Sequence, residues 1–305
     1  MHQPPDDFNP QIGKAVTLSE GLRRIVAPNP SPMTYRGTNT YLLGDHDLAV
    51  IDPGPSIDAH LSAIMQSLEK GQRISHIFVT HTHVDHSPLA RPLSDITGAP
   101  VLAFGGPESG RSDVMRDLAL SGLAGGGEGI DLDFSPDQTL TDGARVAGET
   151  WELEVIHTPG HLGNHIALAW GEMCFTADHV MGWATSLVSP PDGDLTDFMT
   201  SCRRLKERNW SIFHPGHGAP ITAPSERLGW LINHRLGRER EILERLATGP
   251  ASIRTLTEQI YNDVPPALLP AAERNVFAHL VDLWGRSQVS CTPSLSVDAT
   301  FSREV

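Results

Sequence analysis

An apolar segment that runs directly into a cluster of metal-binding side chains is the feature that most constrains this chain. Residues 74–80 predict a buried strand, and His81, His83, Asp85 and His86 follow within six residues. At the two-residue period of extended backbone, His81 and His83 point to the same side, so both imidazoles can reach one cation. Nitrogen and carboxylate ligands at a strand–helix junction, with Pro88 in the first turn of the helix, predict a zinc, manganese or iron site.

Three later segments place further histidines and aspartates just after predicted strands. These candidates are His157, His161, Asp178, His179, His214 and His217. Polar side chains that follow several strands are expected to meet where loops assemble at one edge of a sheet. The alternative interpretation of the first cluster, a polar helix cap with incidental histidines, is therefore disfavoured.

The rest of the pattern predicts a layered α/β domain, because short apolar runs alternate with amphipathic segments. Strands are expected at residues 22–26, 40–43, 48–51, 74–80, 101–104, 151–157, 166–170, 173–176 and 210–213, and helices at 57–70, 90–97 and 197–208. Residues 31–40, 105–130 and 180–196 are expected to be loops around the pocket. Of these, residues 181–188 either form an apolar wall of the pocket or pack in the core.

After residue 225 the pattern becomes helical. Helices are expected at residues 226–246, 252–261 and 267–284, and a short strand at 288–291. We therefore divide the chain into a flexible arm at residues 1–14, a catalytic domain at 15–225 and a small helical module at 226–305.

Charge and cysteine usage narrow the classes of partner. The chain has 23 Lys and Arg against 37 Asp and Glu, a net charge of −14, which disfavours generic binding to nucleic acid or anionic membranes. No apolar run is long enough for a membrane helix, and the first residues lack the pattern of a secretory signal. Three cysteines at scattered spacings fit a reducing compartment, so we expect a cytoplasmic protein. The sequence predicts no oligomeric state.

The motifs together resemble those of the metallo-β-lactamase superfamily. Thr-His-Thr-His-Val-Asp-His at 80–86 is followed by Thr-Pro-Gly-His at 158–161, Ala-Asp-His at 177–179 and Pro-Gly-His-Gly at 215–218. This resemblance spans residues 20–220 and implies a four-layer αββα sandwich. The C-terminal segments at 234–235, 261–263 and 278–280 resemble the winged-helix appendage of the lactamase-β-2-like group.

The resemblance also implies a ligand set for two divalent metal ions. His81, His83 and His161 would bind the first ion, Asp85, His86 and His217 would bind the second, and Asp178 would bridge the two. An aspartate bridge is similar to that of the glyoxalase II and nuclease branches, so antibiotic hydrolysis is not expected. We expect zinc, with manganese or iron as alternatives. Cys174 is expected to be a buried apolar residue and no ligand.

Two cations that share one water lower its pKa from ~15.7 to near neutrality, and Asp85 is the expected catalytic residue that orients the bridging hydroxide. We therefore predict a hydrolase that attacks an ester, thioester or lactone of a small-molecule substrate. The alternative is a single-stranded RNA endonuclease or phosphodiesterase, which the resemblance to the lactamase-β-2-like group implies. A non-catalytic protein with structural metals is disfavoured, because structural zinc sites are closed and four-coordinate.

The remaining candidates have weaker assignments. His157, His165, His179 and His214 are expected to orient ligands or to pack structurally. Asn39 and Tyr41 lie in a segment that could line the pocket, although Tyr41 could also begin a strand.

Overall fold

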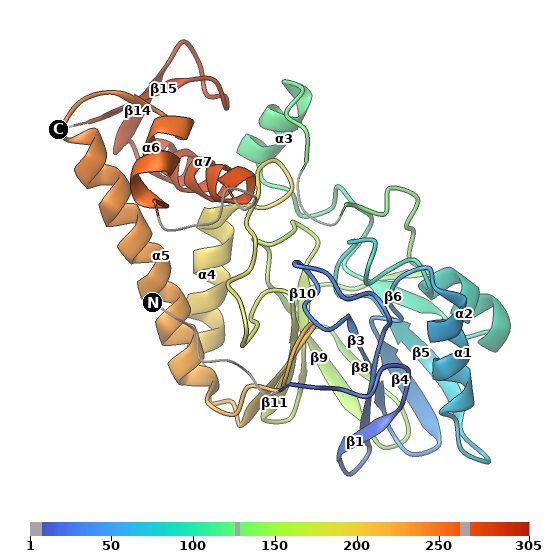
Figure 1. Ribbon diagram of the computed structural model, residues 1–305. Coiled ribbons are helices and arrows are strands. Elements are labelled where there is room, and N and C mark those ends of the chain that lie inside the picture. Colours follow the sequence, from blue (N-terminus) through green and yellow to red (C-terminus); the bar gives the residue numbers. More distant parts are fainter. Residues whose placement is uncertain (1–7, 126–128, 263–268, 305) are drawn as a thin grey trace.

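The computed structural model describes residues 8–125, 129–262 and 269–304. Two sheets face each other at the centre, and helices cover the outer face of each, which confirms the expected αββα order (Figure 1). The expected segments that reach residues 1–7, 126–128 and 263–268 lie partly outside the described residues. In the described part of the expected N-terminal arm, Phe8 is buried and the guanidinium of Arg24 lies over its ring at 4.6 Å.

The first sheet has seven strands in chain order. They are β1 (Val16–Ser19), β2 (Leu22–Val26), β3 (Asn39–Leu43), β4 (Asp47–Ile51), β5 (Arg73–Phe78), β6 (Val101–Ala103) and β7 (Gln138–Thr139). Pairing is antiparallel from β1 to β4 and parallel from β4 to β7. Parallel strands need crossover connections, and α1 (Asp58–Gln66) and α2 (Ala90–Thr97) supply two of them.

The second sheet has five strands. Their order is β12 (Ile212–Pro215), β11 (Met173–Ala177), β10 (Ile166–Trp170), β9 (Glu152–His157) and β8 (Arg145–Ala147). Pairing is antiparallel except between β11 and β12, which run parallel. Helices α4 (Leu195–Lys206) and α5 (Pro224–Leu246) lie outside this sheet (Figure 1).

Alternating side chains fill the apolar layers of the sandwich. On β5, Ile77 packs with Ile64 of α1 and Leu93 of α2, whereas Phe78 points into the layer between the sheets. Successive side chains of a strand point to opposite faces, so a strand buried on both faces reads as a continuous apolar run. Cys174 is fully buried, as expected, in the apolar layer between the second sheet and helices α4 and α5.

The C-terminal module contains α6 (Ile253–Ile260), α7 (Leu269–Gly285) and a three-stranded sheet of β13 (Ala251–Ser252), β15 (Thr300–Arg303) and β14 (Val289–Thr292). Helix α5 joins the two parts of the chain, because Leu228 packs on the second sheet and Ile242 packs in the module. Within the described ranges, no helix is long and apolar enough to cross a membrane.

The expectation that residues 105–130 form only a loop was wrong. Helix α3 (Asp113–Leu120) lies there, and its Met115 and Leu118 belong to the apolar core of the C-terminal module. The Ser112 side chain caps the helix by accepting the backbone N–H of Met115. The expectation for Pro88 was also wrong, because α2 begins at Ala90 and Pro88 lies in the turn before it.

Candidate metal centre

All seven side chains of the expected ligand set meet at one edge of the sandwich, beyond the carboxyl ends of β5, β11 and β12. Each of them exposes 6% or less of its surface. They are His81, His83, Asp85, His86, His161, Asp178 and His217. His81 and His83 do not lie on extended strand as expected, because β5 ends at Phe78. The two rings converge from the loop that follows.

Three imidazoles and one carboxylate form the first group. The Nδ1 atom of His83 lies 3.1 Å from Nε2 of His81 and 3.0 Å from Nε2 of His161. Oδ2 of Asp178 lies 3.6 Å from the same nitrogen of His161. Lone pairs at this spacing can share one cation at the ~2.0–2.1 Å bond lengths of zinc–histidine sites.

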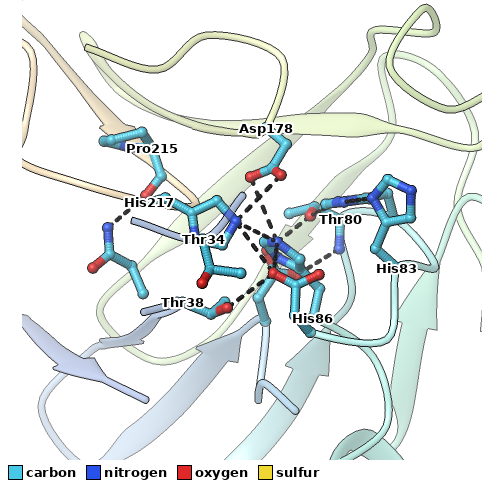
Figure 2. Close-up of polar contacts among 12 residues, drawn as sticks. Thr34, Thr38, Thr80, His83, His86, Asp178, Pro215 and His217 are labelled. Atoms are coloured by element: carbon cyan, nitrogen blue, oxygen red, sulfur yellow. Dashed lines mark hydrogen bonds and ion pairs between the residues drawn. The ribbon is translucent and has the colours of Figure 1, made fainter. Parts of the chain in front are cut away.

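The second group contains two imidazoles and one carboxylate, and it also reaches Asp178. Oδ2 of Asp85 lies 3.2 Å from Nε2 of His86 and 3.2 Å from Nε2 of His217. The Asp178 carboxylate is 3.5 Å from His86 and 3.3 Å from His217 (Figure 2). Asp178 therefore contacts both groups.

The electrostatics of the centre fit a bound cation. Oδ1 of Asp85 and Oδ1 of Asp178 are buried and have no hydrogen-bond partner within the described part of the chain. Burial opposes protonation of His217, but the Asp178 and Asp85 carboxylates raise its pKa to about 10. Burial lowers the pKa of His83 to about 3, so that imidazole is neutral, the form that binds metals. The carboxylates thus create a site for positive charge, and neutral imidazoles are present to ligate it.

Hydrogen bonds at the far nitrogens set the orientation of two imidazoles of the candidate ligand set. Nδ1 of His161 lies 2.7 Å from the carbonyl of Leu187, and Nδ1 of His81 lies 2.9 Å from the Thr80 hydroxyl. Such partners select the tautomer that directs the other nitrogen toward a metal.

Asp52 is a functional residue that the sequence reasoning missed. Its Oδ2 lies 2.9 Å from Nδ1 of His86, and its carboxylate accepts the backbone N–H and the hydroxyl of Thr80, each at 2.8 Å. Its φ of 52° is in the left-handed region, which aspartate tolerates better than most residues. The available signal was an aspartate directly after the strand that ends at Ile51, at the same sheet edge as the histidines.

Asn39 and Tyr41 support the loop that carries His217. The Asn39 amide donates to the carbonyls of Pro215 and Gly218 at 2.9 and 3.0 Å, and the Tyr41 hydroxyl donates to Pro215 at 2.7 Å. Neither residue lines the cavity described below. The pocket role considered for them is therefore replaced by a positioning role.

The other histidine candidates divide into two kinds. His165 lies beside the ligands, with its ring 5.1 Å from that of His81. His157 stacks on Phe104 at 3.8 Å, and His214 lies against Phe175 at 5.3 Å. His179 is buried with Nε2 3.4 Å from the Cys202 thiol. His157 and His214 thus lie against aromatic side chains and His179 lies beside a thiol, and Nε2 of His157 also lies 2.9 Å from the Gly163 carbonyl.

Two neighbours complete the second group. The Thr38 hydroxyl donates to Oδ2 of Asp85 at 3.0 Å (Figure 2). Gly216 must lack a side chain, because a Cβ there would collide with Oδ1 of Asp178 and lie 2.8 Å from the His86 ring.

A cavity of about 290 Å³ opens directly onto the centre. His83, His161, Asp178 and His217 form its floor. The walls are mostly apolar and come from the N-terminal loop, the segment after β11 and the C-terminal module. They are Pro32, Met33, Met181, Trp183, Ala184, Thr185, Ser186, Leu187, Tyr261, Ala271, Ala272 and Asn275. Residues 181–188 were expected either to form a wall of the pocket or to pack in the core. Most of the segment forms a wall of the pocket.

Known proteins resemble this chain both in sequence and in fold. The family model described as "Metallo-beta-lactamase superfamily" matches residues 33–217, and that described as "Beta-lactamase associated winged helix domain" matches residues 252–292. The chain is 33% identical over 286 residues to the Beta-lactamase-like protein 2 homolog of Drosophila melanogaster, covering 88% of this chain and 90% of that protein.

Two further similarities are informative. The chain is 28% identical over 277 residues to the Atrochrysone carboxyl ACP thioesterase of Aspergillus fumigatus, covering 84% of this chain and 78% of that protein. The solved structure of a beta-lactamase domain protein from Burkholderia ambifaria has the same fold, with a TM-score of 0.80 at 21% identity. That match covers 99% of this chain and 97% of the other.

Proposed function

Because this chain belongs to the metallo-beta-lactamase superfamily and carries the associated winged helix domain, we propose that it is a dinuclear metallohydrolase. Its substrate is a small-molecule ester, thioester or lactone. The observation that carries the proposal is the position of Asp178, which contacts both ligand groups at the floor of an apolar cavity.

The ligand assignment follows the two groups. His81, His83 and His161 would hold one divalent ion, Asp85, His86 and His217 would hold the other, and Asp178 would contact both. Zinc fits this set of imidazole and carboxylate donors, and manganese or iron would fit it as well. When bound, the pair of ions acidifies a water molecule and polarises the carbonyl under attack.

Side chains of the protein would supply the proton acceptor and the apolar surroundings of the reaction. The Thr38 hydroxyl donates a hydrogen bond to Oδ2 of Asp85, whereas Oδ1 of Asp85 has no hydrogen-bond partner within the described residues. We assign to Oδ1 the role of accepting a proton from the attacking water, because a general base must carry a free oxygen within reach of that water. The apolar walls would reduce the contact of the reacting carbonyl with bulk water.

A thioester is the favoured member of the substrate class. The relative from Aspergillus fumigatus is named a thioesterase, and the cavity walls are apolar. The net charge of −14 opposes long-range attraction of a polyanion such as RNA. All three cysteines are free, which supports a location in the reducing cytoplasm.

Metal analysis and a substrate panel test the proposal. We expect about two ions per chain, loss of metal in Asp178→Asn, and no loss in Asp142→Asn, whose carboxylate is half exposed and paired with Arg204. The panel contains p-nitrophenyl esters, acyl thioesters, lactones, bis-p-nitrophenyl phosphate and a short single-stranded RNA. Metal-dependent turnover of esters or thioesters is expected. RNA cleavage that falls steeply with salt, with no ester turnover, would instead establish the nuclease alternative.

A further inference from the structure

We propose that the C-terminal module completes an acyl-binding pocket over the metal centre, and that this pocket selects apolar acyl groups of medium size. The inference rests on the proposed function, since it names the substrate class that the same centre hydrolyses. It gives the winged helix domain of this chain a role in substrate choice.

The walls of the cavity come from three separate parts of the chain. Met33 belongs to the N-terminal loop, Trp183 and Leu187 to the segment after β11, and Tyr261 and Ala271 to the C-terminal module. Their side chains are apolar or aromatic where they face the cavity. An acyl chain that fills this space places its carbonyl at the floor, where the candidate ligands lie.

The size of the cavity sets the size of the acyl group. Its volume is about 290 Å³. At about 30 Å³ for each water-sized unit, this space holds roughly ten non-hydrogen atoms. An octanoyl group, or an aromatic acyl group of similar volume, fits that estimate. A fatty acyl group of sixteen carbons exceeds this volume, so its distal end would lie outside the cavity.

The wall from the C-terminal module is fixed to the metal centre through Arg235 of α5. This side chain is 4% exposed, and its guanidinium donates to the Asn275 side chain at 3.0 Å and to the Ser186 carbonyl at 2.5 Å. The next residue along, Leu187, accepts from Nδ1 of His161 at 2.7 Å. The module, the pocket wall and a candidate metal ligand are thus joined by short hydrogen bonds.

Trp183 makes one part of the wall aromatic, whereas two alanines of the C-terminal module leave another part small. Trp183 stacks on Tyr35, with ring centroids 4.9 Å apart and planes at 14°. Ala271 and Ala272 present only methyl groups from α7. A larger side chain in place of either alanine would therefore reduce the space left for the acyl group.

Chain-length profiles of three variants test this assignment. For metal-loaded wild type with acyl thioesters of two to twelve carbons, we expect kcat/KM to rise roughly fourfold per methylene up to about eight carbons and then level off. Ala271→Phe is expected to lower the octanoyl-to-acetyl ratio of kcat/KM at least tenfold, and Met33→Ala to move the onset of the plateau to longer chains. Ala247→Phe, at an exposed position at the end of α5, is the control and keeps the wild-type profile. Opposite shifts at Ala271 and Met33 cannot arise from loss of folding.

Binding measured without catalysis separates this inference from the proposed function. Octanoate is titrated into metal-free protein and followed by tryptophan fluorescence, because Trp183 lines the cavity. We expect octanoate to bind wild type and Ala247→Phe, and to bind Ala271→Phe at least tenfold more weakly. If this pattern holds but no ester or thioester is hydrolysed, the pocket stands and the proposed function fails. If turnover occurs with the same profile in all variants, or if octanoate binds equally to all of them, the acyl pocket is refuted.

Discussion

Replacing Asp52 by asparagine isolates the contribution of a residue that lies behind the metal centre. Oδ2 of Asp52 faces Nδ1 of His86 at 2.9 Å, and the carboxylate also accepts the Thr80 backbone N–H. In Asp52→Asn the amide oxygen can keep the Thr80 contact, but the amide nitrogen cannot accept from His86. Asparagine also tolerates the left-handed backbone at this position, so the loop conformation is retained.

The expected magnitude follows from losing one partner of a candidate ligand. Loss of such a partner weakens metal binding by about 10- to 100-fold, which corresponds to ~1.4–2.7 kcal/mol. The loss should concern the ion held by Asp85, His86 and His217, because Asp52 makes a hydrogen bond to His86. The first ion should be affected less, because Asp52 reaches His81 through the Thr80 hydroxyl rather than by a direct hydrogen bond.

Competition with a series of chelators of increasing affinity, read by metal analysis, measures the effect. We expect Asp52→Asn to retain about one ion per chain at a chelator strength that leaves two on wild type. Asp137→Asn, at a half-exposed carboxylate paired with Arg91, serves as the matched control and is expected to behave as wild type. The reasoning is refuted if Asp52→Asn releases both ions together or neither.

Three further predictions concern single side chains. In Gly216→Ala the new Cβ would collide with the Asp178 carboxylate, so metal content should fall at least tenfold while the circular dichroism spectrum is retained. The control Gly285→Ala adds a Cβ in open space and should keep its metal. Equal metal content in both variants would contradict the close packing at Gly216. Burial lowers the pKa of His60 to about 4, so between pH 6.5 and 4 the unfolded chain binds a proton that the native state does not bind. Stability contributed by neutral His60 is therefore present above pH 6.5 and is lost as the pH falls. From pH 7 to pH 5 the free energy of unfolding of wild type should drop about 2 kcal/mol more than that of His60→Gln in urea titrations, and identical pH profiles would exclude this role. Of the three free cysteines, only the half-buried Cys291 should react rapidly with a thiol reagent in the native protein; fast labelling of more than one thiol would show that the other two are not sealed in the fold.

Local sequence patterns were sufficient to predict a helix or strand where the pattern lay within that one element. The apolar segment at residues 74–80 predicted a buried strand, and the candidate ligands that follow it lie within a few residues of each other. Helix α2 occupies the expected residues, because its apolar positions recur at helical spacing and Gly98 ends it in a left-handed conformation. Helix α3 was missed, because its apolar side chains pack against the C-terminal module, more than a hundred residues away.

The amino-acid sequence by itself determined which chemistry is available, namely the imidazoles and carboxylates at strand ends and the order in which they occur. Only the tertiary structure decided that Asp52 faces His86, that Asn39 supports the His217 loop, and that Ala271 and Trp183 line the same cavity. The physical reason is that hydrophobic periodicity reports the secondary structure of a few neighbouring residues. Contacts between segments that are 34 or 176 residues apart depend instead on how whole layers pack together.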